Sequence, residues 1–210
     1  MTADEEEYIV SHSAAEPAEL ARLYRQTHLT RLYPRMCCEP LQGRILVMLT
    51  AMIKPRRILE LGTFSGYSAL CFAEGMPPGA QLHTVEIDDE AEPALSALFS
   101  ASARSADIHL HIGDALGLIE PLSTEPWDLV YIDANKRHYC DYYRLVKPHM
   151  ARGGFILADN TLWSDHVLDP HSHDAQTEGI RAFNDLVAAD PDVSPVILPI
   201  YDGLTIIKVS

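Results

Sequence analysis

From residue 57 onward, short apolar runs of strand length alternate with segments of helical periodicity. The expected strands are residues 57–61, 81–88, 107–112, 127–133, 154–158, 194–200 and 204–209. The expected helices are residues 67–75, 89–103, 115–122, 138–150 and 178–189. Strands that alternate with helices build a parallel sheet covered on both faces, and Asp202-Gly203 between the last two runs is a hairpin signal. The alternation therefore predicts an α/β fold: a doubly wound, mostly parallel seven-stranded sheet that ends in an antiparallel hairpin.

Two extra N-terminal helices are predicted ahead of this alternation, at residues 15–30 and 40–53. Pro17 suits a first helical turn, and Pro55 ends the second helix. No linker, repeat or composition break divides the chain. We therefore expect residues 1–210 to form a single domain.

The net charge of the chain disfavours polyanionic partners. Asp and Glu number 30 against 16 Lys and Arg, which gives a formal charge of −14. A chain this acidic is not expected to bind a phosphate backbone or an anionic membrane through its overall charge. Residues 1–20 hold six of the acids and no Lys or Arg, and we interpret them as a solvated tail.

The N-terminus and the cysteines indicate a cytoplasmic protein. MTADEEEYIV has no basic region followed by an apolar one, as a signal peptide would, and no run approaches the ~18 apolar residues of a membrane span. None of the four cysteines forms a C-x-x-C pair with another. We expect no disulfide framework, no zinc site and reduced thiols.

Ligands of a doubly wound sheet bind beyond the carboxyl ends of its strands, where polar residues of this chain gather. The first strand carries Glu60 and enters a loop with Gly62 and Gly66, spaced E-x-G-x-x-x-G. The G-x-G-x-x-G spacing of dinucleotide sites is absent, which disfavours an NAD oxidoreductase. An acid before the loop suits a ligand with a positive group better than a pyrophosphate. An ordinary glycine turn between strand and helix is the structural alternative.

The next two strands also end in acids. Glu86 lies where an acid accepts hydrogen bonds from the ribose of a nucleoside ligand, or it belongs to the acidic run that charges the following helix N-terminus. Asp114 either lies beside the base of such a ligand or caps the following helix, and the two roles are compatible.

The fourth and fifth strands end in three oxygen donors, Asp133, Asp159 and Asn160. Oxygen-only ligands select a hard divalent cation such as Mg²⁺, Mn²⁺ or Ca²⁺. Two carboxylates on such an ion leave positions for an anionic bidentate substrate. Strand-end aspartates are also common in α/β enzymes that hold no metal, so the spacing alone leaves both readings open.

Eight segments together resemble one known family. They are MCCEPLQGRIL (36–46), ILELGTFSGYSAL (58–70), VEID (85–88), GDA (113–115), YIDANKRHYCDYY (131–143), ADNTLW (158–163), IRAFN (180–184) and LPIYDGLTI (198–206). In this order the chain resembles the small cation-dependent, S-adenosylmethionine-dependent O-methyltransferases, which include catechol and caffeoyl-coenzyme-A O-methyltransferases. The bacterial, caffeoyl-type branch is the most similar, and the implied fold is the Rossmann-like methyltransferase fold.

The resemblance implies roles for individual residues. The cofactor S-adenosylmethionine would be bound by Cys38, Glu60, Gly62, Ser65, Gly66, Ser68, Glu86, Asp114, Ala115 and Asp133. Within this set, Cys38 would contact the methionine end of the cofactor through its backbone, and Ser68 would hold the same end. Glu86 would bind the ribose, and Asp114 and Ala115 would flank the adenine. A divalent cation, magnesium with manganese or calcium as alternatives, would be held by Asp133, Asp159 and Asn160. Lys136 falls on the catalytic lysine.

The implied reaction moves the methyl group of S-adenosylmethionine to a hydroxyl of a small catechol-like acceptor chelated by the cation. A phenol with a pKa of about 10 is mostly protonated at neutral pH, and a 2+ ion favours the phenolate. Lys136 would take the proton, which requires the charge of the metal to lower its own pKa. The catechol branch has an acidic residue near its last strands, and VILPIYDG offers no convincing counterpart to it, so the resemblance does not establish catechol itself as the acceptor.

Several alternatives stay open on the sequence alone. The same chemistry could methylate 5-hydroxyuridine in transfer RNA, with Arg22, Arg25, Arg31 and Arg35 as a local basic patch, although the net charge disfavours it. A cofactor-binding regulator without catalysis is a more distant alternative. Relatives suggest a homodimer, with residues 1–54 as a lid or dimer contact on a Rossmann-like core of residues 55–210. The His- and Asp-rich loop 163–176 is interpreted as a lid rather than a second metal site.

Overall fold

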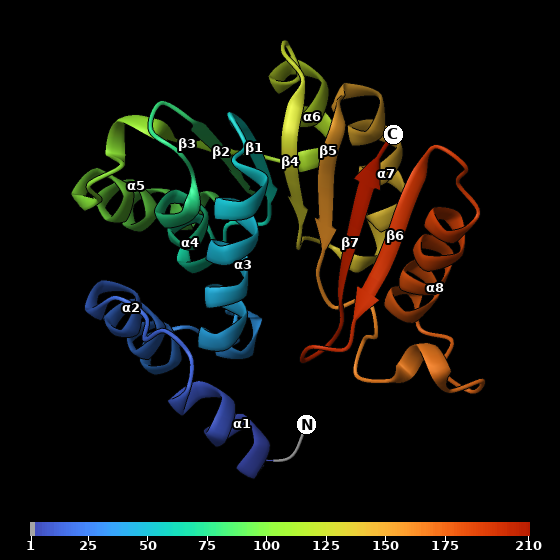
Figure 1. The fold of residues 1–210 in the computed structure, drawn as a ribbon, viewed down its shortest axis with the longest axis horizontal. Helices are drawn as coiled ribbons and strands as arrows, with labels where there is room; N and C mark the ends of the chain where they lie inside the picture. The colour runs from blue at the N-terminus through green and yellow to red at the C-terminus, as the bar shows by residue number, and fades with distance from the viewer. Residues whose placement is uncertain (1–2) are drawn as a thin grey trace.

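The computed structural model describes residues 3–210, so Met1 and Thr2 of the predicted tail lie outside the described part. Its centre is a seven-stranded sheet in the order β3-β2-β1-β4-β5-β7-β6 (Figure 1). The strands are β1 (Arg57–Leu61), β2 (Gln81–Glu86), β3 (Ile108–Ile112), β4 (Trp127–Ile132), β5 (Met150–Ala158), β6 (Val193–Leu198) and β7 (Leu204–Val209). Strands β1 to β5 are parallel, and β7 is antiparallel to both β5 and β6. The predicted fold class is confirmed.

Helices surround this sheet, and short 3-10 turns connect several of the elements. The helices are α1 (Ala3–Ser11), α2 (Ala18–Thr30), α3 (Pro40–Ile53), α4 (Tyr67–Gly75), α5 (Glu92–Ala101), α6 (Ala115–Leu122), α7 (Tyr139–Val146) and α8 (Ala175–Ala188). The 3-10 turns are η1 (Pro34–Met36), η2 (Asp89–Ala91), η3 (Ser105–Asp107), η4 (Lys136–His138), η5 (Lys147–His149) and η6 (His166–Leu168).

Two apolar cores lie on the two faces of the sheet. Successive side chains of a strand point to opposite faces, so Ile58 packs with α3, α4 and α5 while Leu59 packs with α6, α7 and α8. Tyr139, Tyr142 and Tyr143 lie on one face of α7 and are buried in the second core. This two-sided cover explains why the strands of the parallel part are nearly continuous apolar runs.

The predicted helix at 138–150 is shorter in the structure because a proline interrupts it. Helix α7 ends at Val146, and Pro148 lies in the turn η5 before β5 begins at Met150. Proline has no backbone N–H and disfavours helical geometry at the residue before it. Strand β5 therefore starts four residues earlier than the predicted strand 154–158.

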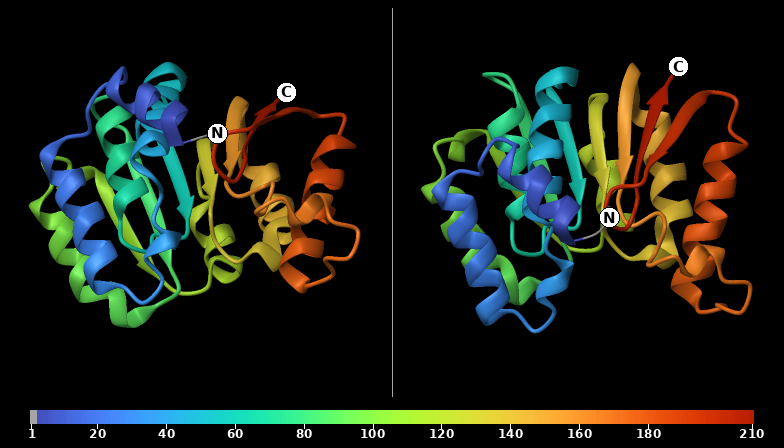
Figure 2. Two further views of the ribbon diagram at one scale, coloured as in Figure 1. Left: turned by 90° about the horizontal axis from the view of Figure 1, so that it is seen from below. Right: turned by 60° about the horizontal axis from the view of Figure 1, so that its bottom comes forward.

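The acidic N-terminus is partly folded, and its interpretation as a solvated tail is wrong for Glu6 and Glu16, whereas Asp4, Glu5, Glu7 and Glu19 are exposed. Residues Ala3–Ser11 form α1, which lies beside the turn between β6 and β7 (Figure 2). There the hydroxyl of Tyr201 donates to Glu6 Oε1 at 2.9 Å. Farther along, the hydroxyl of Tyr67 donates to Glu16 Oε2 at 2.6 Å. Two of the acids thus attach the N-terminal segment to the core.

The stretch Pro34–Ile53 is long and apolar enough to cross a membrane by length and composition alone. In the fold it contains α3, which lies along α4. Leu46 and Thr50 are buried on the packed face, and a Cβ added at Gly75 of α4 would lie 2.6 Å from the Val47 carbonyl oxygen. One face of α3 therefore packs against the core, while Met48 and Met52 on α3 are exposed.

Candidate active site

A cavity of about 1190 Å³ lies over the carboxyl ends of the parallel strands. The loops after β1 to β5 line it together with residues 32–39 and Gln42. Its volume exceeds the ~300–1,000 Å³ typical of a single small-molecule site. The cavity therefore has room for a cofactor and a second small molecule.

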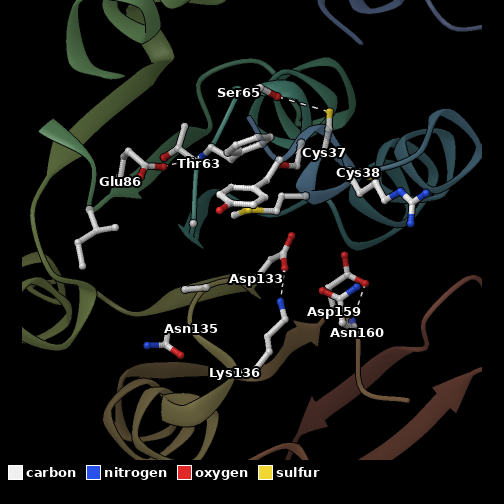
Figure 3. Close-up of a pocket in the computed structure, with 18 of the residues that line it drawn as sticks. Cys37, Cys38, Thr63, Ser65, Glu86, Asp133, Asn135, Lys136, Asp159 and Asn160 are labelled. Atoms are coloured by element: carbon white, nitrogen blue, oxygen red, sulfur yellow. Dashed lines mark hydrogen bonds and ion pairs between the residues drawn. The ribbon is translucent and has the colours of Figure 1, made fainter. Parts of the chain in front are cut away.

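Most of the predicted site residues meet in this cavity (Figure 3). Those that line it are Cys38, Gly62, Ser65, Ser68, Glu86, Asp114, Ala115, Asp133, Lys136, Asp159 and Asn160. Glu60 and Gly66 are not among the lining residues. Glu60 is fully buried behind the loop, where the hydroxyl of Thr84 donates to its Oε2 at 2.6 Å. Gly66 is the N-cap of α4 and takes a left-handed φ of 81°.

Gly62 brings the loop after β1 into contact with the loop after β4. Its φ is 102°, and a Cβ at this position would lie 2.2 Å from the carbonyl oxygen of Asp133. The N–H of Asp133 in turn donates to the Leu61 carbonyl at 2.9 Å. Only glycine has both the backbone freedom and the lack of a side chain that this contact requires.

Glu86 is held in one orientation by the backbone. The N–H of Phe64 donates to Oε2 at 2.6 Å, and the N–H of Asp88 donates to Oε1 at 2.9 Å. Each carboxylate oxygen keeps a further lone pair. Asp114 accepts from the Leu116 N–H at 3.0 Å as the N-cap of α6 and also lines the cavity, so the two roles expected for it are compatible.

The paired cysteines lie at the cavity wall as thiols. Cys37 Sγ is 3.5 Å from Ser65 Oγ, and burial raises the pKa of Cys37 to about 11. Burial also raises the pKa of the Cys38 thiol, and the described cysteines form no disulfide. Both thiols are therefore protonated at neutral pH and unreactive.

Lys136 and Asp133 form a buried ion pair at the end of β4. Nζ donates to Asp133 Oδ1 at 2.6 Å and lies 5.1 Å from the centre of the Tyr139 ring. Burial alone lowers the pKa of Lys136, but the neighbouring charges, Asp133 foremost, raise it above its ordinary value. Helix α8 fixes the backbone here, because a Cβ at Gly179 would lie 2.5 Å from the Lys136 carbonyl oxygen. Without a further positive charge nearby, Lys136 keeps its proton.

Asp159 and Asn160 follow β5 on the adjacent strand. The N–H of Asn160 donates to Asp159 Oδ1 at 2.8 Å, and Asn160 has a φ of 55°, which asparagine tolerates better than most residues. Burial raises the pKa of Asp133, and the charge of Asp159 adds to this while Lys136 opposes it. Two carboxylates and an amide on one cavity wall are ligands that a hard cation prefers. Such a cation would also offset the repulsion between the two carboxylates.

Other groupings of ligand residues do not assemble. Within residues 3–210, no three side chains of His, Cys, Asp or Glu are placed to hold a metal ion. In the loop 163–176, His166 contacts the Ser172 hydroxyl and His173 contacts Glu178. Arg181 of α8 donates to four backbone carbonyls of this loop, at residues 166, 167, 169 and 172. The loop is thus attached to α8 at several points.

Sequence reasoning missed Asp202 as a cavity residue. It lies in the turn between β6 and β7, where it accepts a hydrogen bond from the Ser164 N–H, and burial raises its pKa. In the sequence Asp202-Gly203 is a turn signal, and no local pattern indicates that the side chain of Asp202 lines the cavity. Trp163 also lines the cavity.

A doubly wound sheet with a cofactor-sized cavity over its strand ends defines the class of α/β enzymes that bind a nucleoside-type ligand. The chain belongs to the O-methyltransferase family, whose model matches residues 10–209. The resemblance drawn from the motifs is confirmed, and catechol and caffeoyl-CoA O-methyltransferases are among the relatives.

Individual relatives match along almost the whole chain. An O-methyltransferase named ankF from Aspergillus thermomutatus is 33% identical and covers 97% of this chain and 92% of its own length. A catechol O-methyltransferase of Niastella koreensis is 29% identical and covers 82% of each chain. The structure of the O-methyltransferase TomG of Streptomyces achromogenes, in complex with SAM, aligns with a TM-score of 0.91 at 28% identity over 100% of both chains.

Proposed function

We propose that this protein transfers the methyl group of S-adenosylmethionine to a hydroxyl of a small catechol-like acceptor held by a divalent cation. The observation that carries the proposal is the shared cavity. On one side it has Glu86 with free acceptor lone pairs, and on the other it has Asp133, Asp159 and Asn160 with Lys136 beside them. Relatives named as catechol and caffeoyl-CoA O-methyltransferases, and a relative solved with SAM, support it.

The cofactor would occupy the side of the cavity that follows β1 to β3. Gly62 allows close approach of the ligand to the backbone, and Ser65 and Ser68 offer hydroxyls near the start of α4. Glu86 would accept from the ribose hydroxyls, and Asp114 with Ala115 would flank the base. The sulfonium charge would then lie near Asp133, an acid on the wall shared with the acceptor.

Asp133, Asp159 and Asn160 would hold the cation. When bound, the cation supplies positive charge that favours the phenolate of the acceptor and offsets the charge of the carboxylates. Lys136 is the group placed to accept the phenol proton at Nζ. Because Asp133 raises the pKa of Lys136 in this structure, Lys136 can act as a base only where the charge of Asp133 is offset.

The N-terminal segment would act as a lid over this cavity. Residues 32–39 and Gln42 line it, and three tyrosine–glutamate hydrogen bonds attach the segment to the core or to itself: Tyr201–Glu6, Tyr67–Glu16 and Tyr24–Glu39. Closing the cavity excludes water from the sulfonium and strengthens the electrostatic interactions within it.

The test is methyl transfer to a panel of vicinal-diol phenols, with matched monophenols as controls, in the presence and absence of EDTA. We expect diols to be methylated, monophenols to be inert, and EDTA to abolish transfer until Mg²⁺ is restored in excess. Transfer that is insensitive to EDTA would refute the role of the cation. Cofactor binding without methylation of any diol would refute the acceptor class.

A further inference from the structure

The carboxylate of Asp159 is oriented by two side chains from distant parts of the chain. Gln42 of α3 donates from Nε2 to Asp159 Oδ2 at 2.6 Å. Tyr131 of β4 donates from its hydroxyl to the same oxygen at 2.7 Å. With the Asn160 N–H on Oδ1, the carboxylate accepts three hydrogen bonds in the protein. One oxygen is therefore fully engaged, and Oδ1 is the oxygen that keeps a lone pair.

These contacts are shielded from water. Gln42 and Asp159 are each 5% exposed, and Tyr131 is fully buried. The Tyr131 hydroxyl is the donor in this contact, because a carboxylate oxygen can only accept. A rotation of the carboxylate out of this orientation would leave the buried amide and hydroxyl without an acceptor, which is unfavourable. The orientation of Asp159 is thus fixed before any ligand binds.

Neither donor belongs to the predicted site. Gln42 lies on α3 and reaches the end of β5 across 117 residues of sequence, and Tyr131 lies two residues before Asp133 on β4. Gln42 lines the cavity, whereas Tyr131 lies behind the wall. Together they connect the N-terminal helices and the fourth strand to one candidate ligand.

We propose that Gln42 and Tyr131 are positioning residues, which hold Asp159 so that Oδ1 presents its free lone pair to the divalent cation. The inference rests on the proposed function, because it assigns Asp159 to the cation. Outer groups that orient metal ligands typically change metal affinity by about 10–100-fold when they are removed. The cation should therefore bind more weakly when either donor is lost, although neither donor touches it.

The test measures Mn²⁺ binding to the ligand-free full chain by electron paramagnetic resonance, without cofactor, acceptor or turnover. The variants are Tyr131→Phe, Gln42→Leu and the double variant. Each single variant should raise the Kd for Mn²⁺ about 10-fold or more. The double variant should raise it by less than the product of the two, because both donors act on one oxygen. Thermal unfolding and circular dichroism verify that each variant is folded, and Tyr131→Phe keeps the buried ring in place.

Tyr143→Phe is the matched control. It also removes a tyrosine–aspartate hydrogen bond, partly buried, from Tyr143 to Asp190 Oδ2 at 2.8 Å, but that pair lies outside the cavity. It should leave the Kd for Mn²⁺ unchanged. Wild-type Mn²⁺ affinity in folded Tyr131→Phe and Gln42→Leu would overturn the inference while the proposed function stands. Failure of the wild-type protein to bind Mn²⁺ would overturn the cation site itself, and the inference with it.

Discussion

Glu60 is the buried acid whose substitution tests the electrostatics behind the cavity most directly. Its side chain is fully buried, Oε2 accepts from Thr84, and Oε1 has no hydrogen-bond partner among residues 3–210. Burial raises the pKa of Glu60 to about 8. The charges of Asp133 and Glu86 also raise this pKa, while the hydroxyls of Ser68 and Thr84 lower it. At neutral pH the folded protein therefore holds Glu60 mostly in its neutral form.

This raised pKa makes stability depend on pH in a defined direction. In the unfolded chain a glutamate ionises near pH ~4.3, so above that value the unfolded state releases the proton and the folded state does not. The folded state is disfavoured progressively as pH rises, until Glu60 also ionises in the folded state at about pH 8. At about 1.4 kcal/mol per pH unit, the wild-type protein should lose about 2 kcal/mol between pH 6 and pH 8 through this group.

Glu60→Gln keeps the size of the side chain and an acceptor for Thr84 but cannot ionise. We expect its stability advantage over wild type to be about 2 kcal/mol larger at pH 8 than at pH 6. Urea unfolding of the ligand-free protein, followed by tryptophan fluorescence at both pH values, measures this difference. Comparing two pH values cancels any constant cost of the amide. Glu19→Gln, on the exposed face of α2, is the control and should show no such change.

Two results would refute this reasoning. An advantage of Glu60→Gln that is equal at pH 6 and pH 8 would mean that Glu60 is already ionised at pH 6. A similar pH-dependent advantage for Glu19→Gln would mean that the change does not come from the buried carboxyl of Glu60.

Three further predictions follow from the geometry. Gly62→Ala should lower the free energy of unfolding by at least about 2 kcal/mol and weaken cofactor binding, since its Cβ would meet the Asp133 carbonyl. Gly79 has a similar φ, but apart from its chain neighbours no described atom lies within 4 Å of a Cβ added there. Gly79→Ala should therefore lower the free energy of unfolding in urea clearly less than Gly62→Ala does. Equal losses in the two variants would contradict the clash. Lys136→Met should reduce the rate of methyl transfer by about 10²-fold or more. Its affinity for S-adenosylhomocysteine, measured by calorimetry, should change little. Near-normal turnover of the variant would exclude Lys136 as the base. His83 is half-buried, with Nδ1 3.0 Å from His111 Nε2, and burial together with the charges of His109 and His111 lowers its pKa to about 4. Because the unfolded state takes up the proton first as pH falls below about 6.5, wild type should lose about 1 kcal/mol relative to His83→Gln between pH 7.5 and pH 5.5, after allowance for solvent screening. The absence of this loss in urea unfolding would contradict the pKa shift.

The strand ends were predictable because they depend on short-range signals. The apolar run 57–61 followed by glycines at 62 and 66 marks a strand, a turn and a helix, and each lies where the sequence indicates. The acids that end such strands must share one edge of a parallel sheet, so Glu86, Asp133 and Asp159 could be brought together by topology alone.

Long-range pairing could not be predicted in the same way. The contact between Gln42 and Asp159 depends on how α3 docks against the sheet, and no local pattern encodes this. Glu6 and Glu16 carry no signal that separates them from a solvated acidic run, because their partners Tyr201 and Tyr67 are defined only by the fold. Likewise, Glu60 lies at a strand end, but its distance behind the cavity wall depends on the side to which the strand turns it.

The backbone contact between Gly62 and Asp133 limits how chains of this kind can diversify. Since the two loops touch main chain to main chain, neither can shift without the other, and the separation between the loop after β1 and the candidate cation ligand Asp133 is set by the backbone. Changes in acceptor preference can then come from lining residues that lie outside this contact, such as residues 32–36, 163–164 and 201–202. A library for altered selectivity should randomise those positions and keep Gly62. Substrate choice can then change while the backbone that positions the reacting groups stays the same.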